Sequence, residues 1–373
     1  MKKNGKKLLG HLLAVLVGVV LGLVVGVTLG LLMPDGVGDT GWPVWADIAV
    51  MMLAALIAFL LQTVVHEGGH LVCGLLSGYE FLSFRVGSVM LTKQGDKLVW
   101  RRFSLPGTAG QCLMMPKTED APQLLYNLGG GLANLVLSAL GLLLIPLSGH
   151  FVVGAFACFL FLWGVIMAAT NLIPLRMGGV ANDGFNARAL KNNEQARRAF
   201  LNQLRINGQL AQGVSLKDMP ESWFALPAEP DWDDSLVCSG AYLDIARRQD
   251  RGDDLAQIRR QTEELMSRKG LLGLQRNELT CDLIYCELLL DNRPEERERL
   301  YTPEIQKYVK ATQTYMPHRH SLLYAWALLA DGDEAKAAKH LEAFEKGAAK
   351  YPYPVEMDKE RRMMALVREK AKQ

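Results

Sequence analysis

The segment VVHEGGHLV, residues 64–72, places two histidines and a glutamate inside one of the most apolar stretches of the chain. This stretch runs from Ile48 to about Leu76, and a helix of about 20 apolar residues is long enough to cross the hydrocarbon core of a bilayer. An ionisable group at the centre of such a span costs about 3 kcal/mol and is expected to serve a function. The segment therefore bears on both the fold and the function.

Three further runs have a comparable length, at residues 8–33, 124–147 and 151–175. Buried helices of this length are improbable in a soluble protein, so the sequence predicts a polytopic α-helical membrane protein with about four transmembrane helices. The first run follows four lysines within residues 2–7 and could be taken for a signal peptide. Its apolar part is too long for one, which favours an uncleaved span.

Lysine and arginine are absent between Lys7 and Arg85 and again between Lys117 and Arg176. The basic residues thus fall in the N-terminal tail, in the loop at 85–117 and after residue 176. The positive-inside rule assigns these three places to the cytoplasm, with both termini inside. A net charge of +2 without a concentrated basic stripe argues against a nucleic-acid partner.

The loop between the second and third spans, residues 79–116, alternates apolar and polar residues around a turn that contains Gly95. This pattern predicts a β-hairpin. Its free edge could accept an extended peptide as an additional strand. The alternative is a simple connector that packs on the membrane face.

The chain after residue 184 is rich in charged residues and is expected to be a cytosolic, all-α region. A helix from about Gly184 to Leu210 and a linker that ends at Trp232 give predicted domains at 1–184, 185–232 and 233–373. Turns centred on Gly252, Asn292 and Gly332 recur every 40 residues between apolar and amphipathic helical segments. Three helix pairs at this period resemble tetratricopeptide repeats and predict a small α-solenoid. Such an array binds proteins or peptides on its concave face, or is only structural.

His66 and His70 are spaced i and i+4 and therefore share one face of a helix. Two imidazoles in this arrangement can bind one zinc ion, and Glu67 beside them can accept a proton from water that the metal activates. The prediction is one zinc per chain with Glu67 as the catalytic base. The alternative is that the three side chains only form hydrogen bonds between helices.

A catalytic zinc usually has three protein ligands, so a third must come from elsewhere in the chain. Asp183, in the segment NLIPLRMGGVANDGFN at 171–186, is the best acidic candidate. It could instead cap the helix that follows. Asn134, which follows Gly129–Gly131 in the third span, could join helices by hydrogen bonds or bind the backbone of a substrate.

HEGGH at 66–70, GGGLAN at 129–134, and N-x-x-P at 171–174 followed by Asp183-Gly184 occur in this order. Together they resemble the site-2 protease family of intramembrane zinc metalloproteases, over about residues 46–185. The stretch from Leu175 to Asn182 is longer than is usual in that family. The resemblance implies His66, His70 and Asp183 as zinc ligands, Glu67 as general base, and Asn134 and Asn171 as substrate-positioning or supporting residues.

The expected function is therefore a zinc-dependent intramembrane endopeptidase, in the plasma membrane of a bacterium. It would cut transmembrane segments of other membrane proteins near the cytoplasmic face, and the helical repeats would recruit the substrate or a cytosolic partner. One alternative is a catalytically inactive membrane scaffold that binds partners through its repeats. Another is a membrane protease of the prenyl-protein type, which shares HExxH but has no role for GGGLAN.

Overall fold

The computed structural model describes residues 22–95, 97–103, 108–177 and 180–373. The chain forms two compact units. The bundle unit comprises the residues up to Cys73, Leu125–Leu175 and Asn182–Phe185. The repeat unit comprises Gly74–Leu124, Arg176–Ala181 and Asn186–Gln373.

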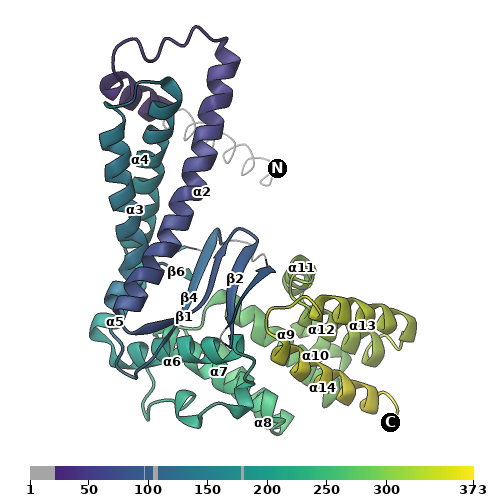
Figure 1. Cartoon of the computed structure of the whole chain (residues 1–373). Helices are drawn as coiled ribbons and strands as arrows, with labels where there is room; N and C mark the ends of the chain where they lie inside the picture. Colours follow the sequence, from purple (N-terminus) through teal and green to yellow (C-terminus); the bar gives the residue numbers. More distant parts are fainter. Residues whose placement is uncertain (1–21, 96, 104–107, 178–179) are drawn as a thin grey trace. The chain divides into compact units, whose positions relative to one another are not determined.

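Three helices of the bundle unit are long and apolar enough to cross a membrane: α2 (Val44–Leu76), α3 (Leu124–Leu144) and α4 (Phe151–Leu172). They run side by side in Figure 1. A shorter apolar helix covers Gly22–Leu32 and packs through Val25 on the other helices. The predicted span at 8–33 is described only from residue 22 onward, and its residues 8–21 lie outside the described ranges. These helices indicate a membrane protein, and exposed leucines and valines along their outer faces suit contact with lipid.

Glycine brings the backbones of these helices into direct contact. A Cβ atom added to Gly129 of α3 would lie 2.6 Å from the carbonyl oxygen of Gly69 and 2.7 Å from Cβ of Cys73, both on α2. A Cβ atom at Gly141 would lie 2.9 Å from the carbonyl oxygen of Ala157 on α4. Gly129 thus allows α3 to approach α2 closely, and Gly141 allows the same between α3 and α4.

The loop after α2 forms an antiparallel sheet of four strands: β1 (Tyr79–Val86), β2 (Val89–Gln94), β3 (Lys97–Arg102) and β4 (Gly110–Pro116). The strand order is β3-β2-β1-β4. The predicted hairpin is confirmed as β2 and β3, which join at Gly95 with a φ of 57°. The sheet is larger than predicted, because β4 returns to pair with β1.

The single helix predicted from Gly184 to Leu210 is wrong. The structure has two helices there, α5 (Asp183–Asn192) and α6 (Glu194–Ala211). The break lies at Asn193, whose side chain accepts a hydrogen bond from the backbone N–H of Ala196 (3.0 Å) and caps α6. A capping residue has an extended backbone, which ends the preceding helix. Helix α6 then packs against β4.

The turns predicted at Gly252, Asn292 and Gly332 are confirmed, and each of these residues has a left-handed backbone, with φ values of 78°, 52° and 65°. These turns join α7 to α8, α9 to α10, and α12 to α13. Two further helices, α11 and α14, were not predicted. The elements after α6 are η1 (Leu216–Asp218), η2 (Glu221–Trp223), α7 (Ser235–Arg251), α8 (Leu255–Met266), α9 (Gly273–Leu289), α10 (Pro294–Leu300), α11 (Pro303–Thr312), α12 (His318–Leu329), α13 (Glu334–Ala348) and α14 (Pro354–Lys370). A two-residue ladder, β5 (Arg176–Met177) and β6 (Val180–Ala181), precedes α5.

Candidate metal centre

The three predicted metal ligands meet in the bundle unit. His66 and His70 lie one turn apart on α2, and Asp183 is the first residue of α5. Asp183 Oδ2 lies 3.5 Å from His66 Nε2 and 3.2 Å from His70 Nε2, and the two Nε2 atoms are 3.2 Å apart. One ligand atom from each residue falls within 4.8 Å of the others, which makes the group a possible metal site.

Hydrogen bonds fix the tautomers of both histidines. Asn134 Nδ2 donates to the backbone carbonyl oxygen (2.9 Å) and Oε1 (2.7 Å) of Gln62, so Asn134 Oδ1 must be an acceptor. It accepts from His66 Nδ1 at 2.7 Å. His70 Nδ1 donates to the carbonyl oxygen of Tyr126 at 2.8 Å. In the neutral imidazoles each Nε2 therefore keeps its lone pair, and both lone pairs are available to a metal.

Gln62 extends this arrangement to a third helix. Its Nε2 donates to the carbonyl oxygen of Leu160 on α4 at 2.8 Å, so a chain of amide hydrogen bonds links α4, α2 and α3 to His66. Gln62 and Asn134 are both 0% exposed. Sequence reasoning missed Gln62, although a glutamine one turn before a histidine inside an apolar span was a signal. For Asn134 the contact that the structure shows is with His66, a candidate ligand, and a contact with substrate stays a prediction.

The backbone of α3 forms a wall of the site. A Cβ atom added to Gly130 would lie 2.5 Å from His70 Nε2 and 2.8 Å from His66 Nε2. On the opposite side of α2, a Cβ atom at Gly68 would meet nothing within 4 Å. The absence of a side chain at Gly130 thus leaves room for an ion between the two Nε2 atoms.

Asn182, rather than Asp183, caps α5. Its Oδ1 accepts hydrogen bonds from the N–H groups of Phe185 (2.8 Å) and Leu175 (3.1 Å). Its Nδ2 donates to the carbonyl oxygens of Thr170 and Ile173, both at 2.6 Å. Asn182 therefore ties the start of α5 to the end of α4, and the side chain of Asp183 is left to face the histidines.

The electrostatics of the site keep Asp183 ionised. Burial raises the pKa of this carboxyl group, but when His66 and His70 are protonated on Nε2, the hydrogen bonds they donate to Asp183 outweigh burial and lower the pKa to about 2. The neighbouring Gly184 allows this placement, because a Cβ atom there would collide with the carbonyl oxygens of Asn171 and Leu172. The site thus combines two neutral nitrogen donors with one anionic oxygen donor.

Glu67 and Asn171, the other predicted site residues, belong to the same unit. Glu67 is buried, on α2 between the two histidines. Asn171 is half-buried at the end of α4, and one of its hydrogen bonds, to the carbonyl oxygen of Met167 (2.8 Å), stays within that helix. The roles of base and of supporting residue stay predictions.

Comparisons of the chain with protein-family models, with curated proteins and with solved structures find no match. The chemistry of the site must therefore be argued from its own geometry. Two imidazole nitrogens and a carboxylate oxygen are typical ligands of a catalytic zinc, which keeps a fourth position open. The convergence of three electron-pair donors in an apolar bundle fits a bound cation.

Proposed function

We propose that the chain is a zinc-dependent intramembrane endopeptidase, similar to the site-2 proteases, that cleaves transmembrane segments of other membrane proteins. The observation that supports this most is the convergence of His66 Nε2, His70 Nε2 and Asp183 Oδ2 between apolar helices, with Glu67 on the same helix as the histidines. Charged and ionisable groups among membrane-spanning helices are costly and usually functional.

The residues present fit zinc well. The tautomers fixed by Asn134 and by the carbonyl of Tyr126 direct both Nε2 lone pairs to one place, and the glycine backbone of α3 leaves space there. When bound, zinc supplies Lewis-acid chemistry that activates water and polarises a peptide carbonyl group. His66, His70 and Asp183 would hold it.

The remaining chemistry belongs to side chains of this protein. Glu67 accepts a proton from the attacking water and returns it to the leaving amine of the peptide bond. Asn134 and Gln62 hold His66 in orientation, so the ligand geometry does not depend on solvent. The buried surroundings strengthen the electrostatic interactions that stabilise the charge on the carbonyl oxygen.

A transmembrane helix must unwind before its peptide bonds become accessible to a catalytic group. The strand order leaves β3 at one edge of the described sheet, and this edge offers backbone N–H and C=O groups to an extended peptide. We propose that an unwound part of the substrate adds to this edge.

The orientation follows from the basic residues. The lysines and arginines fall in the N-terminal tail, in the loop that forms the sheet and in the chain from residue 176 onward. This distribution supports a cytoplasmic location for the sheet, the repeats and both termini in a bacterial plasma membrane. The substrate would be a transmembrane protein. The repeat helices would bind either that substrate or a cytosolic protein.

The test is the metal content of the detergent-purified wild type beside His66→Ala and Glu67→Gln. About one zinc per chain is expected in the wild type and in Glu67→Gln, with loss in His66→Ala. Glu67→Gln should then retain a transmembrane substrate without cleaving it. Wild-type protein that contains no zinc would contradict the proposal and favour the membrane scaffold.

A further inference from the structure

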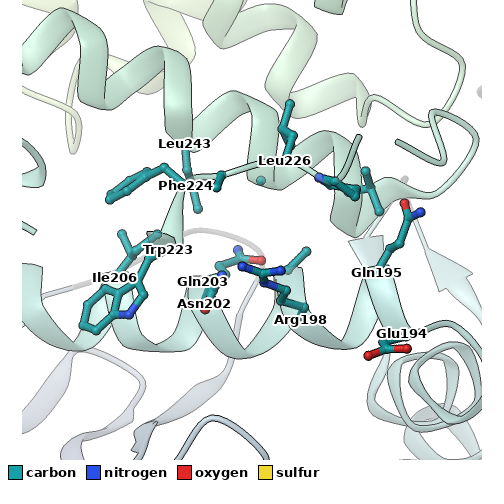
Figure 2. Close-up of a pocket in the computed structure, with 15 residues that line it drawn as sticks. Glu194, Gln195, Arg198, Asn202, Gln203, Ile206, Trp223, Phe224, Leu226 and Leu243 are labelled. Carbon is teal, nitrogen blue, oxygen red and sulfur yellow. The ribbon is translucent and has the colours of Figure 1, made fainter. Parts of the chain in front are cut away.

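The repeat unit contains a cavity of about 410 Å³ bounded by α6, α7, α9, α14 and the start of α12. A second cavity in the same unit, of about 220 Å³, provides a contrast. Figure 2 shows that polar side chains of α6, such as Arg198 and Gln203, face Phe224 and Leu226 across the smaller cavity. The smaller cavity has one acidic and one basic residue, whereas the larger one is strongly acidic. The charged and aromatic residues of the larger cavity are Asp250, Glu278, Asp282, Glu356, Glu360, Lys359, His318, Tyr242 and Tyr351.

Three of the five carboxylates form an ion pair with a basic side chain. Asp250 pairs with Arg362, Glu278 pairs with Arg319, and Glu360 lies 3.4 Å from Lys359 Nζ. Glu278 is also 3.7 Å from His318 Nε2. These three carboxylates are therefore largely neutralised by the protein itself.

Asp282 and Glu356 form no such ion pair, although the charge of Lys359 acts on both and the charge of His318 acts on Glu356. Their hydrogen-bond partners include the neutral side chains of Gln249 and Tyr351. Among the described residues, no basic nitrogen lies close enough to either carboxylate (4.0 Å or less) to form an ion pair. Five carboxylates against three paired cations leave the cavity wall with two carboxylates in excess.

An ionised carboxylate at either position works against folding. Burial raises the pKa of both Asp282 and Glu356, which means that their ionised forms are less favourable in the folded chain than in water. A cation bound in the cavity would offset the free-energy cost of burying the ionised carboxylates. Two tyrosines, Tyr242 and Tyr351, line the same cavity, and an aromatic ring attracts an ammonium or guanidinium group that lies over its face.

We propose that this cavity binds a lysine or arginine side chain of a basic peptide segment. The volume accommodates one long side chain together with part of its backbone, and the two carboxylates in excess match its positive charge. This assignment rests on the proposed protease function for its biological meaning. Membrane proteins carry lysine and arginine at the cytoplasmic ends of their spans, so the segment recognised would be the basic cytoplasmic flank of a substrate.

Peptide binding to the full-length Glu67→Gln chain, in an uncharged detergent, tests this proposal without requiring catalysis. The probe is a short fluorescent peptide of alternating lysine and alanine, compared by anisotropy with a twin that has glutamine in place of each lysine. The lysine peptide is expected to bind, and the glutamine twin to bind at least tenfold more weakly, about 1.4 kcal/mol. Equal binding of the two peptides would overturn the proposal.

Variants of the cavity separate charge recognition from damage to the fold. Asp282→Asn combined with Glu356→Gln should weaken binding about tenfold without lowering Tm, because the amides remove the unfavourable buried charge. Glu298→Gln is the matched control, since Glu298 is exposed on α10 and lies outside the cavity. Lys359→Gln should tighten binding by removing a resident cation, and a misfolded protein could not show such a gain. The proposal is overturned if the double variant binds like Glu298→Gln, or if Lys359→Gln binds less tightly.

The cavity assignment and the protease proposal can fail independently of each other. A chain that binds the lysine peptide but no zinc would keep the cavity assignment and lose the protease. A chain that binds zinc and cleaves a transmembrane substrate, but does not distinguish the two peptides, would keep the protease and lose the cavity assignment.

Discussion

Gly130→Ala should strongly weaken metal binding although it changes none of the proposed ligands. The new methyl carbon would lie 2.5 Å from His70 Nε2, 2.7 Å from His66 Cε1 and 2.8 Å from His66 Nε2. It would therefore occupy the space between the two nitrogens that are proposed to bind the ion. The helix itself should tolerate the change, because alanine has a higher helix propensity than glycine.

The magnitude follows from these distances. An unstrained contact between such atoms is about 3.5 Å, so the ring of His70 must retreat by about 1 Å. Zinc–nitrogen bonds are about 2.0–2.1 Å long and tolerate deviations of about 0.2 Å. A displacement about five times this tolerance should weaken zinc binding by at least ~100-fold, or about 2.7 kcal/mol.

The assay is a chelator titration of detergent-purified protein, with Tm and circular dichroism to confirm folding. Gly68→Ala is the matched control, since the same substitution on α2 meets open space and should retain wild-type zinc affinity. Wild-type affinity in Gly130→Ala would refute the reasoning, because the ion could not then lie between the two Nε2 atoms.

Three further predictions concern the residues that support the site and the repeats. Asn134→Leu removes the acceptor of His66 Nδ1 and should weaken zinc binding by about 10–100-fold in the same titration; unchanged affinity would show that Asn134 does not orient the ring. Asn182→Ala removes the cap of α5 and should lower both the zinc content and the free energy of unfolding, the latter by about 1 kcal/mol. Equal zinc content and stability in Asn182→Ala and in the control Asn186→Ala would contradict this. Glu278→Gln should destabilise the repeat unit by about 3–5 kcal/mol, because it leaves Arg319 buried without its counter-charge. Burial raises the pKa of Glu278, but the hydrogen bond from His318 and the charge of Arg319 outweigh it and lower the pKa to about 2. The ionised Glu278 therefore stabilises the wild type above pH 4.5, the ordinary pKa of the group, and this stabilisation is lost as the pH falls toward 2. If the difference in Tm between the wild type and Glu278→Gln stays constant over this pH range, the pairing is contradicted.

The candidate ligands could be predicted because residue type and short-range spacing in the sequence are enough to indicate them. His66 and His70 require only one helical turn, and Asp183 was the acidic residue at the end of the last predicted span. The sequence could not decide whether Asp183 would bind a metal or cap a helix, because Asn182 and Asp183 are both good capping residues. A helix boundary one residue earlier or later decides the question, and only tertiary contacts fix that boundary.

Other features depend on residues that are distant in the sequence. Gln62 could be recognised as a partner of Asn134 only once α2 and α3 were placed in contact. Strand β4 has no clear alternation of apolar and polar residues. It is a strand because it pairs with β1, which lies more than 20 residues earlier in the sequence. The break at Asn193 interrupts a segment whose composition favours a continuous helix.

The charges on the edge strand β3 affect whether two copies of this protein can associate through it. Lys97 and Arg102 lie at its two ends. If two copies paired antiparallel through this edge, centred on the strand, Lys97 of each would oppose Arg102 of the other, and like charges in directly opposite positions destabilise a sheet. Trp100 is 71% exposed on the same strand and would otherwise favour aggregation. The edge therefore disfavours self-association, while an uncharged or acidic strand from another protein meets no such repulsion.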